Sequence, residues 1–263
     1  MMRNDREDVR TVLMLDELDA MDEQTDGSAF YDAHLRRDYP NVQRTETQIV
    51  PVSTLGTQVS EAIATGHTRA LAHWASTVFK PERATLGSLA ALYQAPLNNV
   101  GVRKVIAAHA ILLSLSGVAR LYLRDMLGVA ALPTPTLLAA QEALANASSN
   151  HKRLLDGITR LVRARQAHEA FHPQAALEVL TLTDGVWSIV RTATQPDRSP
   201  LTLQNGRVVC LTNLSAEEQL ISVDWRAVLG TRNSVRDLLT GTRFNVHGPS
   251  LALQAYQVMW VTT

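Results

Sequence analysis

Apolar residues recur at three- and four-residue steps in three stretches of the chain, 58–79, 102–115 and 151–168. This spacing lines one face of an α-helix, so the pattern predicts helices in all three stretches. Gly66 interrupts the first stretch, and we expect it to separate two helices. The apolar run Val118–Leu123 follows the second stretch and predicts a short strand.

Two weaker helix signals lie outside these stretches. The run Val9–Met21 places Val9 and Leu13 on one face of an acidic helix, and Leu86–Tyr93 predicts a short helix that stops near Pro96. Residues 1–40 carry eleven acidic and five basic residues, which we interpret as a solvated face or a loose N-terminal segment.

The hydrophobic period changes from a helical to a strand pattern after Pro173. Seven short runs follow, separated by turn signals such as Asp184-Gly185 and Asn205-Gly206. The number and shortness of these runs predict an antiparallel β-sandwich. We therefore expect an unassigned acidic segment 1–46, a mostly helical part 47–173 and a C-terminal β-sandwich domain 174–263. The predicted strands are 177–182, 186–190, 207–211, 220–223, 235–239, 251–253 and 256–261.

Composition narrows the class of protein. The chain has 263 residues, with 25 basic and 25 acidic residues, so it lacks the Lys/Arg surplus typical of nucleic-acid binders. Its single cysteine, Cys210, allows no intrachain disulfide, which fits a reducing compartment. The longest apolar segment, Val105–Val118, is too short and too polar to span a bilayer. We predict a cytoplasmic protein with no metal or cofactor site and no nucleic-acid or membrane partner.

Several segments resemble a known enzyme family. Val105–Tyr122 ends in Gly-Val-Ala-Arg-Leu-Tyr, and Arg163–Pro173 reads Arg-Ala-Arg-Gln-Ala-His-Glu-Ala-Phe-His-Pro. Both are similar to the end of the barrel in the α-amylase superfamily of glycoside hydrolases, and more narrowly in its sucrose-phosphorylase-like branch. The tail segments Val209–Ser215, Asp237–Gly241 and Ala255–Trp260 are similar to the C-terminal β-domain of the same enzymes.

The resemblance implies a (β/α)8 barrel (TIM barrel) with a C-terminal β-domain and retaining chemistry on α-glucosides. That chemistry uses an aspartate nucleophile, a glutamic acid and an aspartate in a His-Asp pair. The sequence contains no Gly-x-Arg-x-Asp string and no His-Asp dipeptide, so we assign no catalytic residue. A complete barrel takes about 250 residues, whereas the β-sandwich leaves too few here. We expect an α/β plus all-β chain with an incomplete barrel, from a truncated or degenerate member or one half of a split gene.

Two pairs of acidic residues and one histidine are candidates for a catalytic role. The pairs Asp16/Glu17 and Asp22/Glu23 have the composition of catalytic carboxylates, but neighbouring acids on a charged helix usually face solvent, which we favour. His109 lies in an apolar helix, where a core histidine bonded to the backbone is the better interpretation.

Basic residues near the end of the helical part also have two interpretations. His168 and His172 flank Phe171, and we expect packing and junction hydrogen bonds from them rather than proton transfer. Arg160, Arg163 and Arg165 have the chemistry to bind a phosphate or an acidic partner, although we favour a solvated helix face.

The strand region holds three tryptophans and the cysteine. Trp187, Trp225 and Trp260 have the ring faces that stack on sugars, but in short strands we expect them to pack in the core. Cys210 sits in an apolar strand, so we expect a buried small hydrophobe rather than a nucleophile.

Three functional hypotheses remain. The first is part of an α-glucoside-converting enzyme, whose parent would bind an α-glucoside or phosphate, with this chain inactive alone. The second is a non-catalytic sugar-binding or protein-interaction module. The third is a complementing half of a split enzyme, which would self-associate or bind a separate N-terminal fragment through exposed strand edges.

Overall fold

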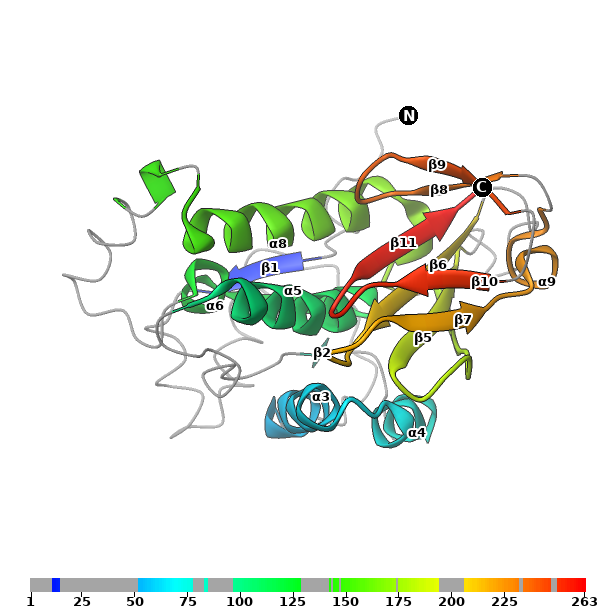
Figure 1. Cartoon of the computed structure of the whole chain (residues 1–263), viewed down its shortest axis with the longest axis horizontal. Coiled ribbons are helices and arrows are strands. Elements are labelled where there is room, and N and C mark those ends of the chain that lie inside the picture. The colour runs from blue at the N-terminus through cyan, green and yellow to red at the C-terminus, as the bar shows by residue number, and fades with distance from the viewer. Residues whose placement is uncertain are drawn as a thin grey trace, which may run out of the picture.

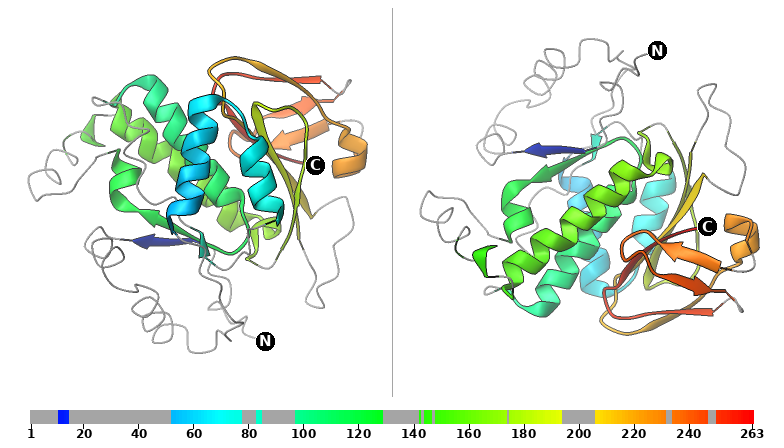
Figure 2. Two further views of the ribbon diagram at one scale, coloured as in Figure 1. Left: turned by 90° about the horizontal axis from the view of Figure 1, so that it is seen from below. Right: turned by 90° about the horizontal axis from the view of Figure 1, so that it is seen from above.

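The structure is a computed structural model of the chain. It describes residues 11–14, 52–77, 83–84, 97–128, 142, 144–146, 148–173, 175–193, 206–231, 234–246 and 250–263. The helices gather on one side of the molecule and an antiparallel sheet forms the other (Figures 1 and 2).

A small parallel sheet lies among the helices. Its central strand is β3 (Val118–Tyr122), paired in parallel with β1 (Thr11–Met14) on one side and β2 (Arg83–Ala84) on the other. The predicted strand at 118–123 is therefore confirmed. The predicted acidic helix over Val9–Met21 is wrong at Thr11–Met14, because this run of β-branched and apolar residues pairs with β3. The rest of that prediction lies outside the described residues.

The first predicted helical stretch is two helices, α3 (Val52–Thr65) and α4 (Arg69–Thr77). Gly66 separates them with φ of 72°, a left-handed conformation that glycine adopts without steric cost. The predicted break at this residue is confirmed.

The second and third predicted helices are also confirmed. They are α5 (Asn99–Ser114) and α8 (Asn150–Ala167), and the short α6 (Leu123–Leu127) follows β3. The side chains of Asn98 and Ser149 cap α5 and α8 by accepting hydrogen bonds from backbone N–H groups in the first turn. Because α5 connects the parallel neighbours β2 and β3, these elements form one βαβ unit. The prediction of a helix over 86–93 lies outside the described residues.

Helices α5 and α8 pack closely along their length. Gly157 of α8 lies against the side chain of Ile106, and a Cβ atom at Gly157 would be only 2.9 Å from Ile106 Cγ1. The missing side chain therefore permits the close approach of the two helices.

The C-terminal part is an antiparallel β-structure of two sheets. One sheet has six strands in the order β4-β5-β6-β11-β8-β9, and a second pairs β10 with β7. Each of the seven predicted runs overlaps one of these strands. The structure adds β9 and a one-turn helix, α9 (Trp225–Leu229), which the alternation of apolar residues did not predict. The strands are β4 (Ala176–Val179), β5 (Val186–Thr192), β6 (Arg207–Asn213), β7 (Gln219–Ser222), β8 (Ser234–Asp237), β9 (Arg243–Asn245), β10 (Ser250–Leu253) and β11 (Val258–Thr262).

The central strands β5, β6 and β11 of the six-stranded sheet are buried on both faces. Along β6, Val208 and Cys210 belong to the core shared with α5 and α8, whereas Val209 and Leu211 belong to the core shared with β7, β10 and α9. Successive side chains of a strand point to opposite faces, so an uninterrupted apolar run serves both cores. The first core joins residues on both sides of position 174, and the division into separate domains there stays a prediction.

Among the described residues, no helix has both the length and the apolar character required to cross a bilayer.

Candidate functional site

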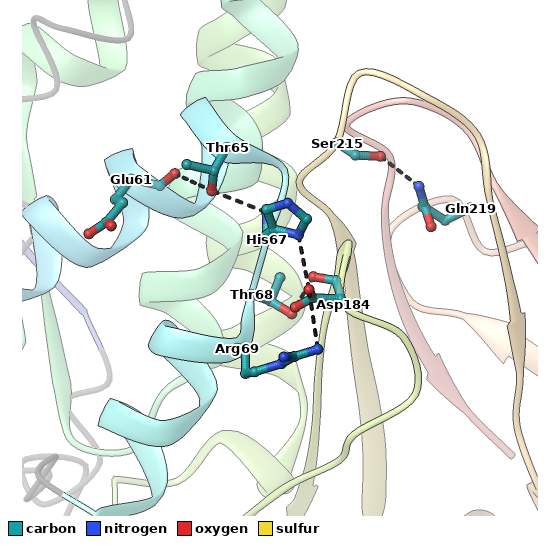
Figure 3. Close-up of polar contacts among 8 residues, drawn as sticks. All are labelled: Glu61, Thr65, His67, Thr68, Arg69, Asp184, Ser215 and Gln219. Atoms are coloured by element: carbon teal, nitrogen blue, oxygen red, sulfur yellow. Dashed lines mark hydrogen bonds and ion pairs between the residues drawn. The ribbon is translucent and has the colours of Figure 1, made fainter.

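A polar cluster lies where the α3–α4 turn meets the turn between β4 and β5 (Figure 3). The Thr65 hydroxyl donates to the carbonyl of Glu61 at 2.8 Å and accepts from the backbone N–H of His67 at 3.3 Å. Together with the left-handed Gly66, these contacts shape the turn and direct the His67 side chain toward Asp184 of the β-structure.

We call His67, Thr68, Arg69 and Asp184 the junction cluster, and Asp184 lies at its centre. Its Oδ2 lies 2.9 Å from His67 Nδ1 and 3.6 Å from Arg69 Nη2. The Asp184 backbone carbonyl accepts from the N–H and the hydroxyl of Thr68, at 2.6 and 2.8 Å. The His67 and Arg69 side chains are 69% and 88% exposed, so solvent screens these ion pairs, and each contributes about 0–1 kcal/mol.

A cavity of about 320 Å³ lies beside the cluster, between α4 and the β4–β5 turn. Its wall is rich in hydroxyl groups, and Asp184 Oδ1 is a buried acceptor with no hydrogen-bond partner among the described residues. Such a wall can hydrogen-bond a small polar ligand. The hydroxyl-bearing lining residues are Thr68, Ser76, Thr181, Thr183 and Ser188.

Among the described residues, no hydroxyl forms a hydrogen bond with the His67 imidazole, whose partner is Asp184. A His–Asp pair activates a serine only when the serine hydroxyl reaches the imidazole. The nearby Ser215 hydroxyl instead accepts from Gln219 Nε2 at 3.0 Å and lies within 2.8 Å of Asn213 Oδ1. Figure 3 shows that hydroxyl pointing toward Gln219, away from His67. The arrangement therefore joins the α3–α4 turn to the β-structure and offers a polar cavity beside it.

Two buried arginines hold the junction deeper inside. Arg165 of α8 donates from Nη1 to the carbonyls of Leu113 and Leu115, the second at 3.0 Å, and from Nη2 to the carbonyl of Gly117 at 2.6 Å. Leu113 lies in the last turn of α5 and Leu115 is its C-cap residue, so Arg165 caps that helix, and its bond to Gly117 extends the contact to the segment before β3. The prediction that Arg165 lies on a solvated face is wrong, because its guanidinium is fully buried against these carbonyls.

Arg191 of β5 is the second buried arginine. It donates from Nε to the carbonyl of Ala170 at 3.1 Å, from Nη2 to that of His172 at 3.0 Å and from Nη1 to the Ser116 hydroxyl. Burial lowers the pKa of Arg191 to about 10, so the group stays charged at neutral pH. The sequence did not single out this residue, since an arginine in a short strand carries no signal of burial.

The structure agrees with the expectations for His109 and Cys210. His109 is buried, and its Nδ1 lies 2.8 Å from the carbonyl of Val105, one helical turn earlier. Burial lowers the pKa of His109 to about 4, partly opposed by this hydrogen bond. Cys210 is fully buried, and burial raises the pKa of its thiol. Neither group is placed for proton transfer or nucleophilic attack at neutral pH.

The three strand-region tryptophans are all buried. Trp187 donates from Nε1 to the Ser114 hydroxyl at 3.3 Å, and Trp260 stacks obliquely on Phe171 with ring centroids 4.6 Å apart. Trp225 packs against Phe244 at the start of α9. Their rings pack inside the core, so the packing interpretation is confirmed, and these three rings form no platform for a sugar.

His168 and His172 belong to an HExxH string, His168-Glu-Ala-Phe-His172. An HExxH string binds zinc when both histidines share one face of an α-helix. Here neither His168 nor His172 has a helical backbone, a single 3-10 turn lies between them, and His168 Nδ1 accepts from the N–H of Ala170 at 3.1 Å. Within the part of the chain that the structure describes, no three His, Cys, Asp or Glu residues gather to hold a metal ion.

The remaining candidates are two arginines of α8 and the two acidic pairs. Arg160 and Arg163 are exposed on α8, as expected. The acidic pairs Asp16/Glu17 and Asp22/Glu23 lie outside the described residues. The sequence did not predict the junction cluster, because His67 and Asp184 are 117 residues apart and only a turn signal marks the second.

The fold of the chain matches part of several solved structures. No protein-family model matches it, and no curated protein does. The crystal structure of AmyP in complex with maltose has a TM-score of 0.58 at 12% identity, over 79% of this chain and 48% of that chain. The α-amylase from Geobacillus thermoleovorans, complexed with acarbose, has a TM-score of 0.53 at 14% identity, over 79% and 46%. The acarbose-soaked debranching enzyme of Nostoc punctiforme has a TM-score of 0.55 at 13% identity, over 97% and 57%.

These neighbours are α-amylase-family glycoside hydrolases, and this chain shares their fold over part of their length. The chain spans about half the length of the structures that it matches. At such low identity the likeness concerns the fold alone. The resemblance read from the sequence is thus confirmed at the level of fold, and the sucrose-phosphorylase-like branch stays a prediction.

Proposed function

We propose that this chain contributes the last βα units of the barrel and the C-terminal β-domain of an α-amylase-type protein of carbohydrate metabolism. Within that family we place it in the sucrose-phosphorylase-like branch, on the similarity of Val105–Tyr122 and Arg163–Pro173 to the barrel end of that branch. The parent activity would be transfer of an α-glucosyl unit to phosphate or water.

One observation carries this proposal. The βαβ unit β2–α5–β3 and α8 precede the antiparallel sheet, and solved α-amylase-type structures match the fold of this chain over about half of their own length. In the proposal, the junction cluster and the buried arginines hold the barrel elements against the β-domain. They supply contact rather than chemistry.

By itself the chain is expected to be inactive on α-glucosides. Retaining hydrolysis needs a nucleophilic carboxylate and a protonated carboxylic acid about 5 Å apart. The sequence has neither the Gly-x-Arg-x-Asp string nor a His-Asp dipeptide. Purified protein would be incubated with sucrose, maltose and maltotriose, with and without phosphate, and the release of glucose and glucose 1-phosphate would be measured. Turnover above a heat-denatured control would contradict the proposed division of roles.

The coding DNA upstream of Met1 offers an independent test. A reading frame encoding a Gly-x-Arg-x-Asp strand and a strand with a catalytic glutamate would support the proposal. A frame that encodes neither would count against a contribution to that enzyme.

A complementing half of a split enzyme is the second candidate. Among the described residues, β1 and β2 each pair on one side only, which leaves backbone groups of the parallel sheet available to further strands. Light scattering at several protein concentrations would detect the expected self-association, and a monodisperse monomer at all of them would contradict it. For a sugar-binding module, calorimetric titration with maltose and α-glucans is the test, although the buried tryptophans lend it no support.

A further inference from the structure

An open groove of about 630 Å³ lies between α5 and α8, and it shares no lining residue with the cavity beside the junction cluster. Four arginines line it, together with the apolar Val102 and Ile106, Thr159 and one acid, Asp156. We call this surface the arginine groove. Its arginines are Arg103 of α5 and Arg153, Arg160 and Arg163 of α8.

The positive charge of this groove is largely uncompensated. Asp156 forms an ion pair with Lys152 one turn earlier in α8. Arg153 donates from Nη1 to the side-chain oxygen of Asn99, a neutral partner, at 2.5 Å. For the other three arginines, no ion pair with any described residue occurs. A solvated helix face usually intersperses acids with such a group, and this one supplies a single acid that is already engaged.

The groove is elongated. Arg153 and Arg160 are seven residues apart in α8, about 10 Å along the helix axis, and Arg163 extends the row to about 15 Å. Arg103 faces the row from α5. A ligand that engages several of these guanidinium groups at once must therefore carry several negative charges in a line.

We propose that the arginine groove binds a ligand bearing a linear polyphosphate group. Planar guanidinium groups donate two parallel hydrogen bonds to phosphate oxygens. Adjoining phosphates carry more charge per unit length than a row of single carboxylates, so they match a row of arginines better. The lining includes no aromatic ring, which disfavours stacked bases of single-stranded nucleic acid. This inference is independent of the proposed carbohydrate function.

Calorimetric titration of the full chain tests the proposal. The probes are inorganic phosphate, pyrophosphate and tripolyphosphate, at low salt, neutral pH and without divalent cations. We expect affinity to rise at each step of this series, and to fall several-fold when sodium chloride is raised from about 50 to about 200 mM. Equal affinity for all three probes, or no binding of tripolyphosphate, would overturn the proposal.

Matched variants separate the groove from overall charge. The double variant Arg160→Gln/Arg163→Gln should bind tripolyphosphate about tenfold more weakly, because two charge-assisted contacts are lost. The control Arg226→Gln/Arg243→Gln removes the same charge from exposed positions of the β-structure and should change affinity by less than twofold. Equal losses in both variants would contradict a specific groove. Circular dichroism checks that all four exposed substitutions leave the fold intact.

An acidic peptide is the competing ligand chemistry. A synthetic peptide with the sequence of residues 15–26, Leu-Asp-Glu-Leu-Asp-Ala-Met-Asp-Glu-Gln-Thr-Asp, provides the comparison. Weaker binding of this peptide than of tripolyphosphate supports the proposal, and tighter binding that depends on Arg160 and Arg163 would replace polyphosphate by an acidic protein segment.

Discussion

Substitution of Arg165 by methionine tests how the end of α5 is held. Methionine keeps much of the apolar stem but removes the guanidinium donors to the carbonyls of Leu113, Leu115 and Gly117. Leaving a buried carbonyl without a partner costs about 1–3 kcal/mol each. Release of the buried guanidinium charge offsets several kcal/mol of that loss. We therefore expect the free energy of unfolding to fall by about 3 kcal/mol, and the melting temperature by about 10 °C.

Urea unfolding at pH 7 measures this loss. Tryptophan fluorescence reports on the buried Trp187 and Trp260, and far-ultraviolet circular dichroism reports on the helices; coincident transitions support a two-state treatment. Arg163→Met is the matched control, because Arg163 lies in the same helix but is exposed, and its loss should stay within about 0.5 kcal/mol. Equal stability of the Arg165→Met and Arg163→Met variants would refute the capping role of Arg165.

Three further predictions concern buried residues. The pKa of His109 is about 4 in the folded chain against 6.5 when unfolded, so the unfolded state binds more protons between these values and stability falls as pH is lowered through this window. Between pH 7 and pH 5, His109→Gln should remove about 2 kcal/mol of this pH dependence in urea unfolding. Gly157→Ala should destabilise the chain despite a helix-propensity gain of about 1 kcal/mol, because the new methyl group overlaps Ile106, and Ile106→Ala should relieve part of the loss in a double-mutant cycle. The Cys210 thiol should react with a thiol reagent only after unfolding, as measured by labelling kinetics in increasing urea.

Each of these predictions has a result that contradicts it. For His109, the wild type and the variant would show the same pH dependence. For Gly157, the two substitutions would be additive, which would mean that the α5–α8 contact tolerates a methyl group. For Cys210, labelling in the absence of urea at the rate of the fully denatured chain would mean that the thiol is accessible in the native state.

Most elements of the fold could be predicted from hydrophobic periodicity. The helices α5 and α8 and the strands β5 and β6 have long runs of the appropriate period, and the structure has them within a few residues of the predicted ends. Hydrophobic periodicity did not predict the shortest elements. Strand β9 has three residues and an exposed face, and β1 is a strand only because β3 lies beside it. The local pattern carries too few residues to choose between helix and strand in such cases.

The candidate site could be predicted only in part. Burial of His109 and Cys210 follows from their apolar surroundings in the sequence. The contact between His67 and Asp184 does not, because it joins turns 117 residues apart, and the local signals at Gly66 and Asp184-Gly185 indicate only that the chain turns there. Likewise the HExxH string at His168 fails as a metal signal, because the chain leaves the helix at that residue.

Arg163 and Arg165 differ in burial although their sequence contexts are alike. They are two residues apart in α8, have the same side chain and share one local pattern, so the sequence by itself determined that both belong to a helix with basic residues. The tertiary structure alone decided that Arg163 lines an open groove while Arg165 is buried. The reason is physical: packing of α8 against α5 brings the carbonyls at and just beyond the end of α5 within reach of the Arg165 guanidinium, whereas Arg163 lies at the groove.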